Sequence, residues 1–216
     1  KASIPMADAV VDLLGDRITS GVIVTKHEHA GGWAAPGFEV IEAGHPVPDE
    51  DSVRGAEAVA ELADEATERD LVICLISGGG SALLTRPVDG VSLDDLQGVT
   101  GALLGSGATI NEINAVRKHS SGIKGGNLAR LVAPARLVTL ILSDVIGDPL
   151  DVIASGPTVP DTTTIDDARE VLERYGVEGG GVLRETPKPG DPLFESVQNV
   201  VVGSNRLAAK AAAEKA

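Results

Sequence analysis

The chain has 216 residues, of which 43% are hydrophobic and only 2% aromatic, and its formal net charge is −14. This length and hydrophobic content allow one large domain with a core of Val, Leu, Ile and Ala, and they exclude a disordered polymer. The negative charge argues against nucleic acid and against an anionic membrane surface as partners, because both require clustered Lys and Arg.

Apolar residues at helical spacing predict a first helix that ends at Gly15. Further helices are expected over residues 49 to about 67, 93–104, 110–132 and 166–175 and near the C-terminal end. The 110–132 helix should break at Gly122 or at Gly125-Gly126. Short apolar runs predict buried strands over residues 21–25, 38–43, 71–76, 137–142 and 197–202. This alternation predicts an α/β fold with a mostly parallel sheet and helices on both faces.

Polar or glycine-rich sequence follows three of the predicted strands, at residues 77–81, 143–148 and 203–205. Parallel sheets bind ligands beyond the carboxyl ends of their strands. We therefore expect these three segments to lie along one edge of the sheet and to form a binding site there.

The loop Ser77-Gly78-Gly79-Gly80-Ser81 follows a buried strand directly. Its glycines allow backbone N–H groups to approach an anion, and the two serine hydroxyls add donors. A flexible turn without a ligand is the alternative. The loop is not a Walker-type phosphate loop, since no Gly-Lys-Ser/Thr follows, and it lacks the Gly-x-Gly-x-x-Gly spacing of a dinucleotide site.

Basic residues gather in the 110–132 segment of this acidic chain. Asn114, Arg117 and Lys118 share one helix face, and Lys124 follows them. They predict either a cationic patch that holds a carboxylate or phosphate, or a solvated helix face with ion pairs, and composition alone favours neither.

Two carboxylates lie near the end of the fourth predicted strand. Asp144 and Asp148 could bind Mg²⁺ or accept a proton from a substrate hydroxyl, although turn formation and helix capping are alternatives. His45 lies in a turn after the second strand, where a structural role is more common. His27 and His29 are too few for a metal site without further ligands.

Six stretches closely resemble the glycerate 2-kinase family, whose members have often been labelled hydroxypyruvate reductases. They are EAGHPVPD (42–49), LISGGGSALL (75–84), SGATINEINAVRKH (106–119), IKGG (123–126), LSDVIGD (142–148) and IASGPTVPD (153–161). They occur in the same order as in the family and cover nearly the whole chain.

The resemblance implies transfer of the γ-phosphate of ATP, with Mg²⁺, to the 2-hydroxyl of D-glycerate. It implies a larger Rossmann-like domain, here residues 1–216. It also implies a smaller MOFRL domain that carries an active-site arginine, and we expect this second domain and its arginine to be absent from this chain. It assigns Lys1 and Asp144 to catalysis and Asp144 with Asp148 to the metal. The residues expected to bind phosphate or substrate are His45, Ser77, Gly78, Gly79, Gly80, Ser81, Asn114, Arg117, Lys118 and Lys124, and those expected near the nucleotide are Gly203, Ser204 and Asn205.

Two other functions stay open, a hydroxypyruvate reductase and a non-catalytic domain that binds anions or sugar phosphates. We expect a cytoplasmic protein that takes a small-molecule substrate, and the oligomeric state, including a homodimer, is left open. Many acidic residues and few lysines on a small-residue core suggest adaptation to high salt, as in halophiles, with an ordinary acidic protein as the alternative. Both chain ends fall inside helical patterns, so we expect a fragment of a longer protein.

Overall fold

The computed structural model describes residues 2–178 and 181–215, so Lys1 lies outside the described residues. The strands are β1 (Gly21–Lys26), β2 (Phe38–Ala43), β3 (Leu71–Ile76), β4 (Arg136–Ser143) and β5 (Val197–Ser204). The α-helices are α1 (Ser3–Leu14), α2 (Glu50–Asp64), α3 (Gly80–Leu83), α4 (Leu93–Gly105), α5 (Ile110–His119), α6 (Asn127–Val132), α7 (Ile165–Arg174) and α8 (Asn205–Lys215). Short 3₁₀ turns occur at η1 (Gly15–Arg17), η2 (Ile153–Ser155) and η3 (Pro192–Ser196).

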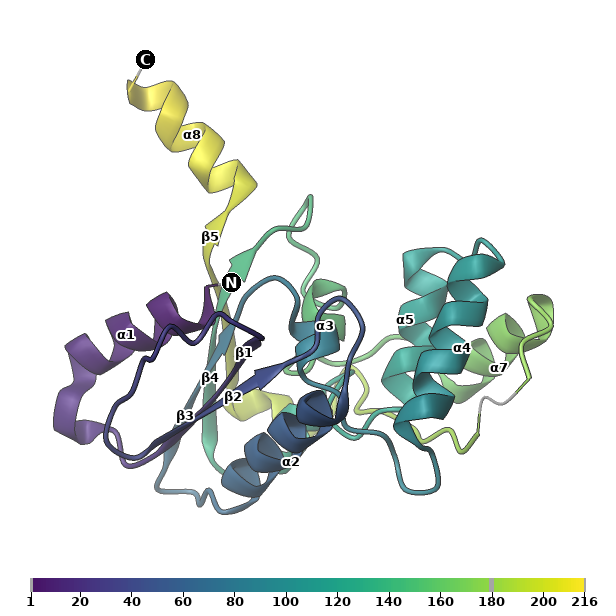
Figure 1. The fold of residues 1–216 in the computed structure, drawn as a ribbon, viewed down its shortest axis with the longest axis horizontal. Helices are drawn as coiled ribbons and strands as arrows, with labels where there is room; N and C mark the ends of the chain where they lie inside the picture. The colour runs from purple at the N-terminus through teal and green to yellow at the C-terminus, as the bar shows by residue number, and fades with distance from the viewer. Residues whose placement is uncertain (1, 179–180, 216) are drawn as a thin grey trace.

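All described strand pairs are parallel, which confirms the predicted sheet type. The strands form two hydrogen-bonded groups, β1–β2 and β3–β4–β5, with β4 in the centre of the second group. Helix α1 packs against β1 and β3, whereas α2 packs against β1 and β2, and Figure 1 shows the two helices on opposite sides of the strands. The predicted arrangement of helices on both faces is therefore confirmed.

The core is divided between the strands and a separate helical layer. The first cluster joins Ala56 of α2, Leu128 and Val132 of α6, and Leu137 of β4. A second cluster lies among α4, α5 and α7, which form a group beside the strands in Figure 1. Because α5 belongs to this helical layer, residues on its inner face are buried rather than solvated.

Four helices begin with a reciprocal capping box, in which the N-cap side chain and the N3 side chain each satisfy the other residue's backbone N–H. The pairs are Asp49 with Ser52, Ser92 with Asp95, Thr109 with Glu112, and Thr164 with Asp167. A cap of this kind stabilises a helix by about 1 kcal/mol. The caps explain why these boundaries follow closely from the sequence.

The predicted break in the 110–132 segment is confirmed, because α5 ends at His119 and α6 begins at Asn127, just after Gly125 and Gly126, which have φ of 57° and 84°. The non-helical part is longer than predicted, since it extends over residues 120–126. Strand β5 runs two residues longer than predicted and leads straight into α8. Within residues 2–178 and 181–215, no helix has both the length and the apolar character needed to cross a membrane.

Candidate functional site

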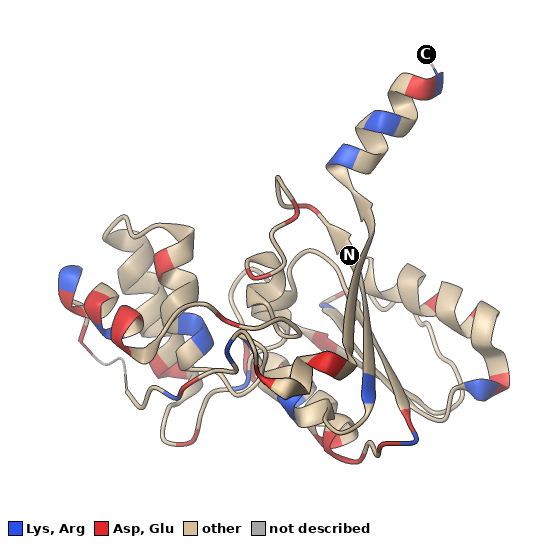
Figure 2. Cartoon of the chain, turned by 180° about the vertical axis from the view of Figure 1, so that it is seen from behind, with Lys and Arg blue, Asp and Glu red and all other residues tan. Residues whose placement is uncertain are grey.

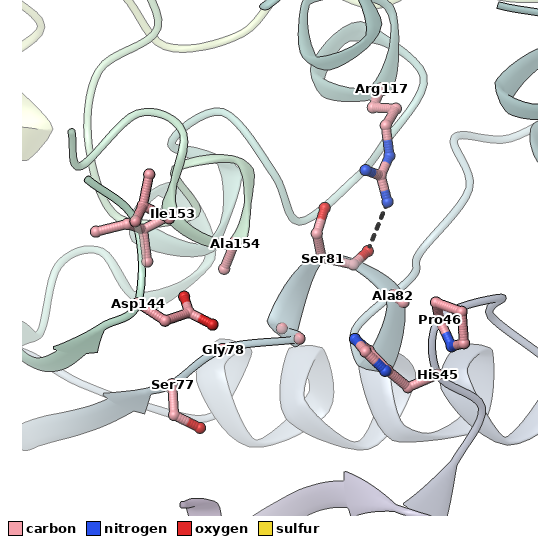
Figure 3. A pocket seen from close by; sticks show the side chains of 13 residues that line it. His45, Pro46, Ser77, Gly78, Ser81, Ala82, Arg117, Asp144, Ile153 and Ala154 are labelled. Carbon is pink, nitrogen blue, oxygen red and sulfur yellow. Dashed lines mark hydrogen bonds between the residues drawn. The ribbon is translucent and has the colours of Figure 1, made fainter. Parts of the chain in front are cut away.

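A cavity of about 230 Å³ lies where β3 and β4 end, as the strand-edge argument predicts. The loop after β3, the start of the loop after β4, the turn after β2 and one side chain of α5 surround it (Figure 3). Its described lining comprises His45, Pro46, Ser77, Gly78, Gly79, Gly80, Ser81, Ala82, Arg117, Asp144, Val145, Ile153 and Ala154.

Each glycine of the loop allows a different wall of the cavity to approach closely. A Cβ atom on Gly78 would overlap with the carboxylate of Asp144, and one on Gly79 would lie 2.9 Å from the His45 ring. A Cβ atom on Gly80 would lie 3.0 Å from Cβ of Ala154. The three glycines therefore leave the backbone N–H groups accessible, and they also allow Asp144, His45 and Ala154 to pack closely against the loop.

Arg117 is the basic residue that reaches the cavity. One of its Nη atoms donates a hydrogen bond to the carbonyl oxygen of Ser81 at 3.1 Å. Burial lowers the pKa of Arg117, but a guanidinium remains protonated in proteins. Its other N–H groups can bind a carboxylate or phosphate in a bidentate manner.

The other predicted cations lie behind the cavity, and none of its described lining residues is Lys118 or Lys124. Lys118 is 3% exposed and forms an ion pair of 3.1 Å with Asp161, which is 1% exposed. Lys124 donates to the carbonyl oxygen of Leu84 at 2.7 Å. Burial, and next the charge of Arg117, hold the pKa of Lys124 well below its usual value. The predicted cationic patch is therefore reduced to Arg117 among the lining residues.

Asn114 is also buried, and it contacts the cavity wall through Ser155. The Ser155 hydroxyl donates to Oδ1 of Asn114 at 3.1 Å and lies 2.7 Å from the Ser81 hydroxyl. Ser155 and its neighbour Ala154 lie in one of the stretches that resemble the family, but the sequence did not assign them to the site. The available signal was the Ser-Gly-Pro run of residues 155–157, which means little until Ser81 is seen beside it.

The two predicted strand-end carboxylates have different surroundings. Asp144 is exposed and lines the cavity, whereas Asp148 has a φ of 54° and lies 3.9 Å from Arg206. Gly203 and Ser204 pair with Leu142 and Ser143 at the end of β4. These two residues and the exposed Asn205 are next to the Asp144 segment without being part of the described lining.

Outside the cavity lining, three side chains that could ligate a metal ion lie close together. They are His27, Asp49 and Asp51, and among the described residues no other group of three His, Cys, Asp or Glu side chains is this close. Asp49 accepts a hydrogen bond from His27 at 2.7 Å and caps α2. Burial alone would raise the pKa of Asp49, but hydrogen bonds from His27, Gly44 and Ser52 lower it far below its usual value. These oxygens already have partners that fix the turn after β2, in which His45 lies.

The structure is thus a parallel α/β domain with a glycine loop and a carboxylate at its strand ends and an arginine of α5 beside them, at the edge where proteins of this class bind ligands. Residues 1–183 match the model of a family described as a domain of unknown function, DUF4147. A D-glycerate 2-kinase of Thermotoga maritima is 52% identical over 193 residues, which are 87% of this chain and 46% of that protein. A glycerate 2-kinase of Pyrococcus horikoshii is 45% identical, over 100% of this chain and 50% of that protein.

Solved structures agree with these relatives. The crystal structure of glycerate kinase from Thermotoga maritima matches with a TM-score of 0.86 and 44% identity, over 97% of this chain and 51% of that one. A protein of Pyrococcus horikoshii matches with a TM-score of 0.87 and 42% identity, over 100% of this chain and 51% of that one. The chain belongs to the glycerate 2-kinase family, in the part that the DUF4147 model describes. It spans about half the length of the curated relatives that it matches.

Proposed function

We propose that this chain forms one wall of the active site of a kinase that transfers a phosphoryl group from ATP to the 2-hydroxyl of D-glycerate. The observation that carries this proposal is the packing of the Asp144 carboxylate against Gly78, beside a loop of backbone donors and across the cavity from Arg117. Phosphoryl transfer depends mainly on positioning and on charge stabilisation, and these groups supply both.

The residues present suit the phosphates of a nucleotide and a Mg²⁺ ion. Gly78, Gly79 and Gly80 line the cavity, and without side chains they allow Asp144, His45 and Ala154 to approach the backbone N–H groups that would bind phosphate oxygens. Mg²⁺ is commonly held by one or two carboxylates together with substrate phosphates, and Asp144 offers such a carboxylate. When bound, the ion would neutralise charge on the phosphate oxygens. We also keep Asp148, Gly203, Ser204 and Asn205 as proposed contacts near the metal and nucleotide.

In this proposal Arg117 binds the carboxylate of glycerate and Asp144 orients the 2-hydroxyl. Asp144 accepts the hydroxyl proton as the new oxygen–phosphorus bond forms and the bond to the leaving ADP breaks. Backbone N–H groups of residues 78–80 stabilise charge on the transferred group. His45 closes the cavity over Gly79. Lys1, which lies outside the described residues, remains a proposed catalytic residue.

The cavity volume sets a limit on what this chain binds by itself. A cavity of about 230 Å³ is smaller than the roughly 300–1,000 Å³ typical of small-molecule sites. It suits a three-carbon acid and a phosphoryl group better than a complete nucleotide. We therefore propose that residues 1–216 are the larger domain of the enzyme, that the part of the relatives outside this match completes the site, and that this chain alone turns over little or no substrate.

Further proposals concern the setting of the reaction. Use of ATP suits a cytoplasmic protein, and the charge of −14 supports a small-molecule substrate rather than nucleic acid or a membrane surface.

An assay of the full-length protein separates the kinase from the reductase. ATP-dependent formation of 2-phosphoglycerate from D-glycerate is expected. Oxidation of NADH with hydroxypyruvate, without ATP turnover, would instead support the reductase. A 49% identical relative from Agrobacterium vitis carries the name putative hydroxypyruvate reductase. Binding of ATP and glycerate without turnover in the full-length protein would support a non-catalytic binding domain.

The variant Asp144→Asn tests the role of the carboxylate. It should lower kcat by about 10²–10⁴-fold, because the amide cannot accept the hydroxyl proton and is a poorer Mg²⁺ ligand. Asp89→Asn is the matched control, since Asp89 pairs with Arg184 on the surface and its side chain is 91% exposed. Near wild-type turnover in a folded Asp144→Asn protein would contradict the proposed role.

A further inference from the structure

The strongest feature outside the proposed chemistry is a buried chain of hydrogen bonds behind the glycine loop. It connects Asn114 of α5, Ser155 of η2 and Ser81 of α3 (α3 is shown beside Ala154 and Arg117 in Figure 3). Asn114 is 4% exposed and Ser155 is fully buried, at 0%. Only Ser81, at one end of this chain of hydrogen bonds, lines the cavity.

The direction of these hydrogen bonds follows from the chemistry of the three groups. Oδ1 of Asn114 can only accept, so the Ser155 hydroxyl donates its single proton to it. Ser155 then has no proton for Ser81, and the 2.7 Å contact requires that Ser81 donates to Ser155. The Ser81 hydroxyl therefore has only lone pairs left for a ligand. This direction differs from the expectation that the Ser81 hydroxyl adds a donor for a bound anion.

The backbone around Ser155 is held in a conformation that fixes this contact. Ala154 and Ser155 have φ of 51° and 60°, a left-handed region that costs non-glycine residues about 1–2 kcal/mol each. The carbonyl oxygen of Ser155 accepts a hydrogen bond from Gly125 at 2.9 Å. Strain of this kind persists only where the surroundings enforce it, and it is common at functional sites.

We infer that Ser81 is a specificity-determining residue that accepts a hydrogen bond from the non-reacting 3-hydroxyl of the substrate, and that Ser155 is the positioning residue which keeps Ser81 an acceptor. This inference rests on the proposed function. The 2-hydroxyl already donates its one proton to Asp144, so the hydroxyl that is free to donate is the one on C3. Arg117 binds both the Ser81 carbonyl and, in the proposal, the substrate carboxylate, which places a short hydroxy acid beside Ser81.

An acceptor at this position distinguishes three acids that differ only at C3. D-Glycerate has a hydroxyl there and can donate to Ser81. D-Lactate has a methyl group and cannot. Hydroxymalonate has a second carboxylate, whose oxygens would face the lone pairs of Ser81. The site should therefore prefer D-glycerate to the other two, because a buried polar group left without a partner is costly.

The test measures the affinity of the full-length protein for the three acids in wild type, Ser81→Ala and Ser155→Gly. Ser81→Ala should lower the preference for D-glycerate over D-lactate by about tenfold, and Ser155→Gly by at least about threefold. Ser155→Gly should also bind hydroxymalonate about three- to tenfold more tightly than wild type, because Ser81 is then free to donate. Ser81→Ala should not show that gain.

The choice of glycine separates the hydroxyl of Ser155 from its backbone. Glycine adopts the left-handed conformation without strain, so a residue needed only for the turn would tolerate it. Unchanged ratios in a stable Ser155→Gly protein would thus overturn the inference. Asn114→Asp keeps an acceptor facing Ser155 and should retain the wild-type ratio, and a loss there would overturn the assigned direction. A wild-type protein without ATP-dependent phosphorylation of D-glycerate would instead refute the proposed function itself, and the inference with it.

Discussion

Gly78 and Asp144 show how closely a backbone and a side chain must approach to form this site. The Asp144 carboxylate occupies the space that a side chain on residue 78 would need. The absence of a side chain on Gly78 therefore allows the carboxylate to lie next to the backbone of the loop. In phosphoryl transfer, a fixed relation between the proton acceptor and the phosphate donors is the main source of rate.

The variant Gly78→Ala should displace Asp144 and lower kcat by about 10²-fold, since a misplacement of about 1 Å has an effect of this size. Its stability should change little, because Asp144 is exposed and can move away. Activity is measured by formation of 2-phosphoglycerate in the full-length protein.

Gly98→Ala is the matched control for this variant. A methyl group added to Gly98, which lies in α4, would meet no atom of another part of the chain within 4 Å. Alanine should therefore raise stability by about 0.5–1 kcal/mol and leave kcat unchanged. Full activity in Gly78→Ala would show that the position of Asp144 is not critical.

The sequence indicated the loop and Asp144 correctly as members of one strand edge, because strand order along a parallel sheet fixes which ends meet. It could not place Lys118 and Lys124. Helical spacing fixes the side on which Lys118 points, but it does not reveal what packs there. Asp161 comes from a segment more than 40 residues away, and that partner removes Lys118 from the cavity.

Helix α5 is anchored by charged and polar groups as well as by apolar contacts, and Lys118, His119 and Asp161 among them are buried. Asp161 accepts hydrogen bonds from Lys118, Thr163 and Thr186. The buried His119 ring contacts the carbonyl oxygen of Ala115 and the carboxylate of Glu185. This group ties α5, and with it Asn114 and Arg117, to the segments that follow η2.

Asp161→Asn should destabilise the protein by about 3–5 kcal/mol, because it removes the buried carboxylate 3.1 Å from Lys118 and leaves this buried charge only the half-exposed Asp151 at 3.9 Å. Urea unfolding gives the free energy. Asp166→Asn is the control, since Asp166 pairs with Arg169 at the surface with a side chain that is 90% exposed, and it should change stability by no more than about 1 kcal/mol. A loss of equal size in both variants would contradict this account.

Acid should weaken the same region. Burial would raise the pKa of Glu185, but hydrogen bonds from Lys188, Thr186 and His119 lower it from 4.5 to about 2. Burial likewise opposes the hydrogen bonds and the Lys118 charge that lower the pKa of Asp161. Both folded pKa values lie below the unfolded ones, so this stability is complete above about pH 4.5 and is lost as the pH falls toward 2.

Thermal unfolding between pH 6 and pH 2.5 measures this loss, and Glu185→Gln should flatten the curve in the acidic range. A melting temperature that stays constant from pH 5 to pH 3 would argue against the predicted linkage.

Capping residues explain why most helix starts were predictable, and glycines indicated a break within residues 110–132, but the end of α5 at His119 was not predictable. The apolar pattern continues through residues 110–132 on both sides of the break. The chain turns at Ser120 and Ser121 instead, where Ser121 pairs with Pro87 in an isolated bridge. That contact joins segments more than 30 residues apart, so no local pattern could indicate it.

Acidic side chains are distributed over the strand layer and the helical layer alike, as Figure 2 shows. With a net charge of −14, these groups repel one another more in the compact state than in the unfolded chain. The repulsion acts over about 10 Å at 0.1 M salt and about 3 Å at 1 M.

The melting temperature should therefore rise by at least about 3 °C between 0.05 M and 1 M KCl at pH 7. Near pH 4.6, the isoelectric point calculated from the sequence, the same change in salt should have little effect. A melting temperature that does not respond to salt at pH 7 would contradict the salt-adapted interpretation of the composition.

Helix α8 differs from the other α-helices, because all of its residues 205–215 are exposed. It also extends away from the strands in Figure 1. Isolated helices shorter than about 12–15 residues are marginal in water, and α8 has 11. In this chain of 216 residues, α8 is therefore expected to open at a lower free energy than the sheet. Amide protons of α8 should exchange with solvent through local fraying, while those of β5, which continues into it, require the opening of the sheet.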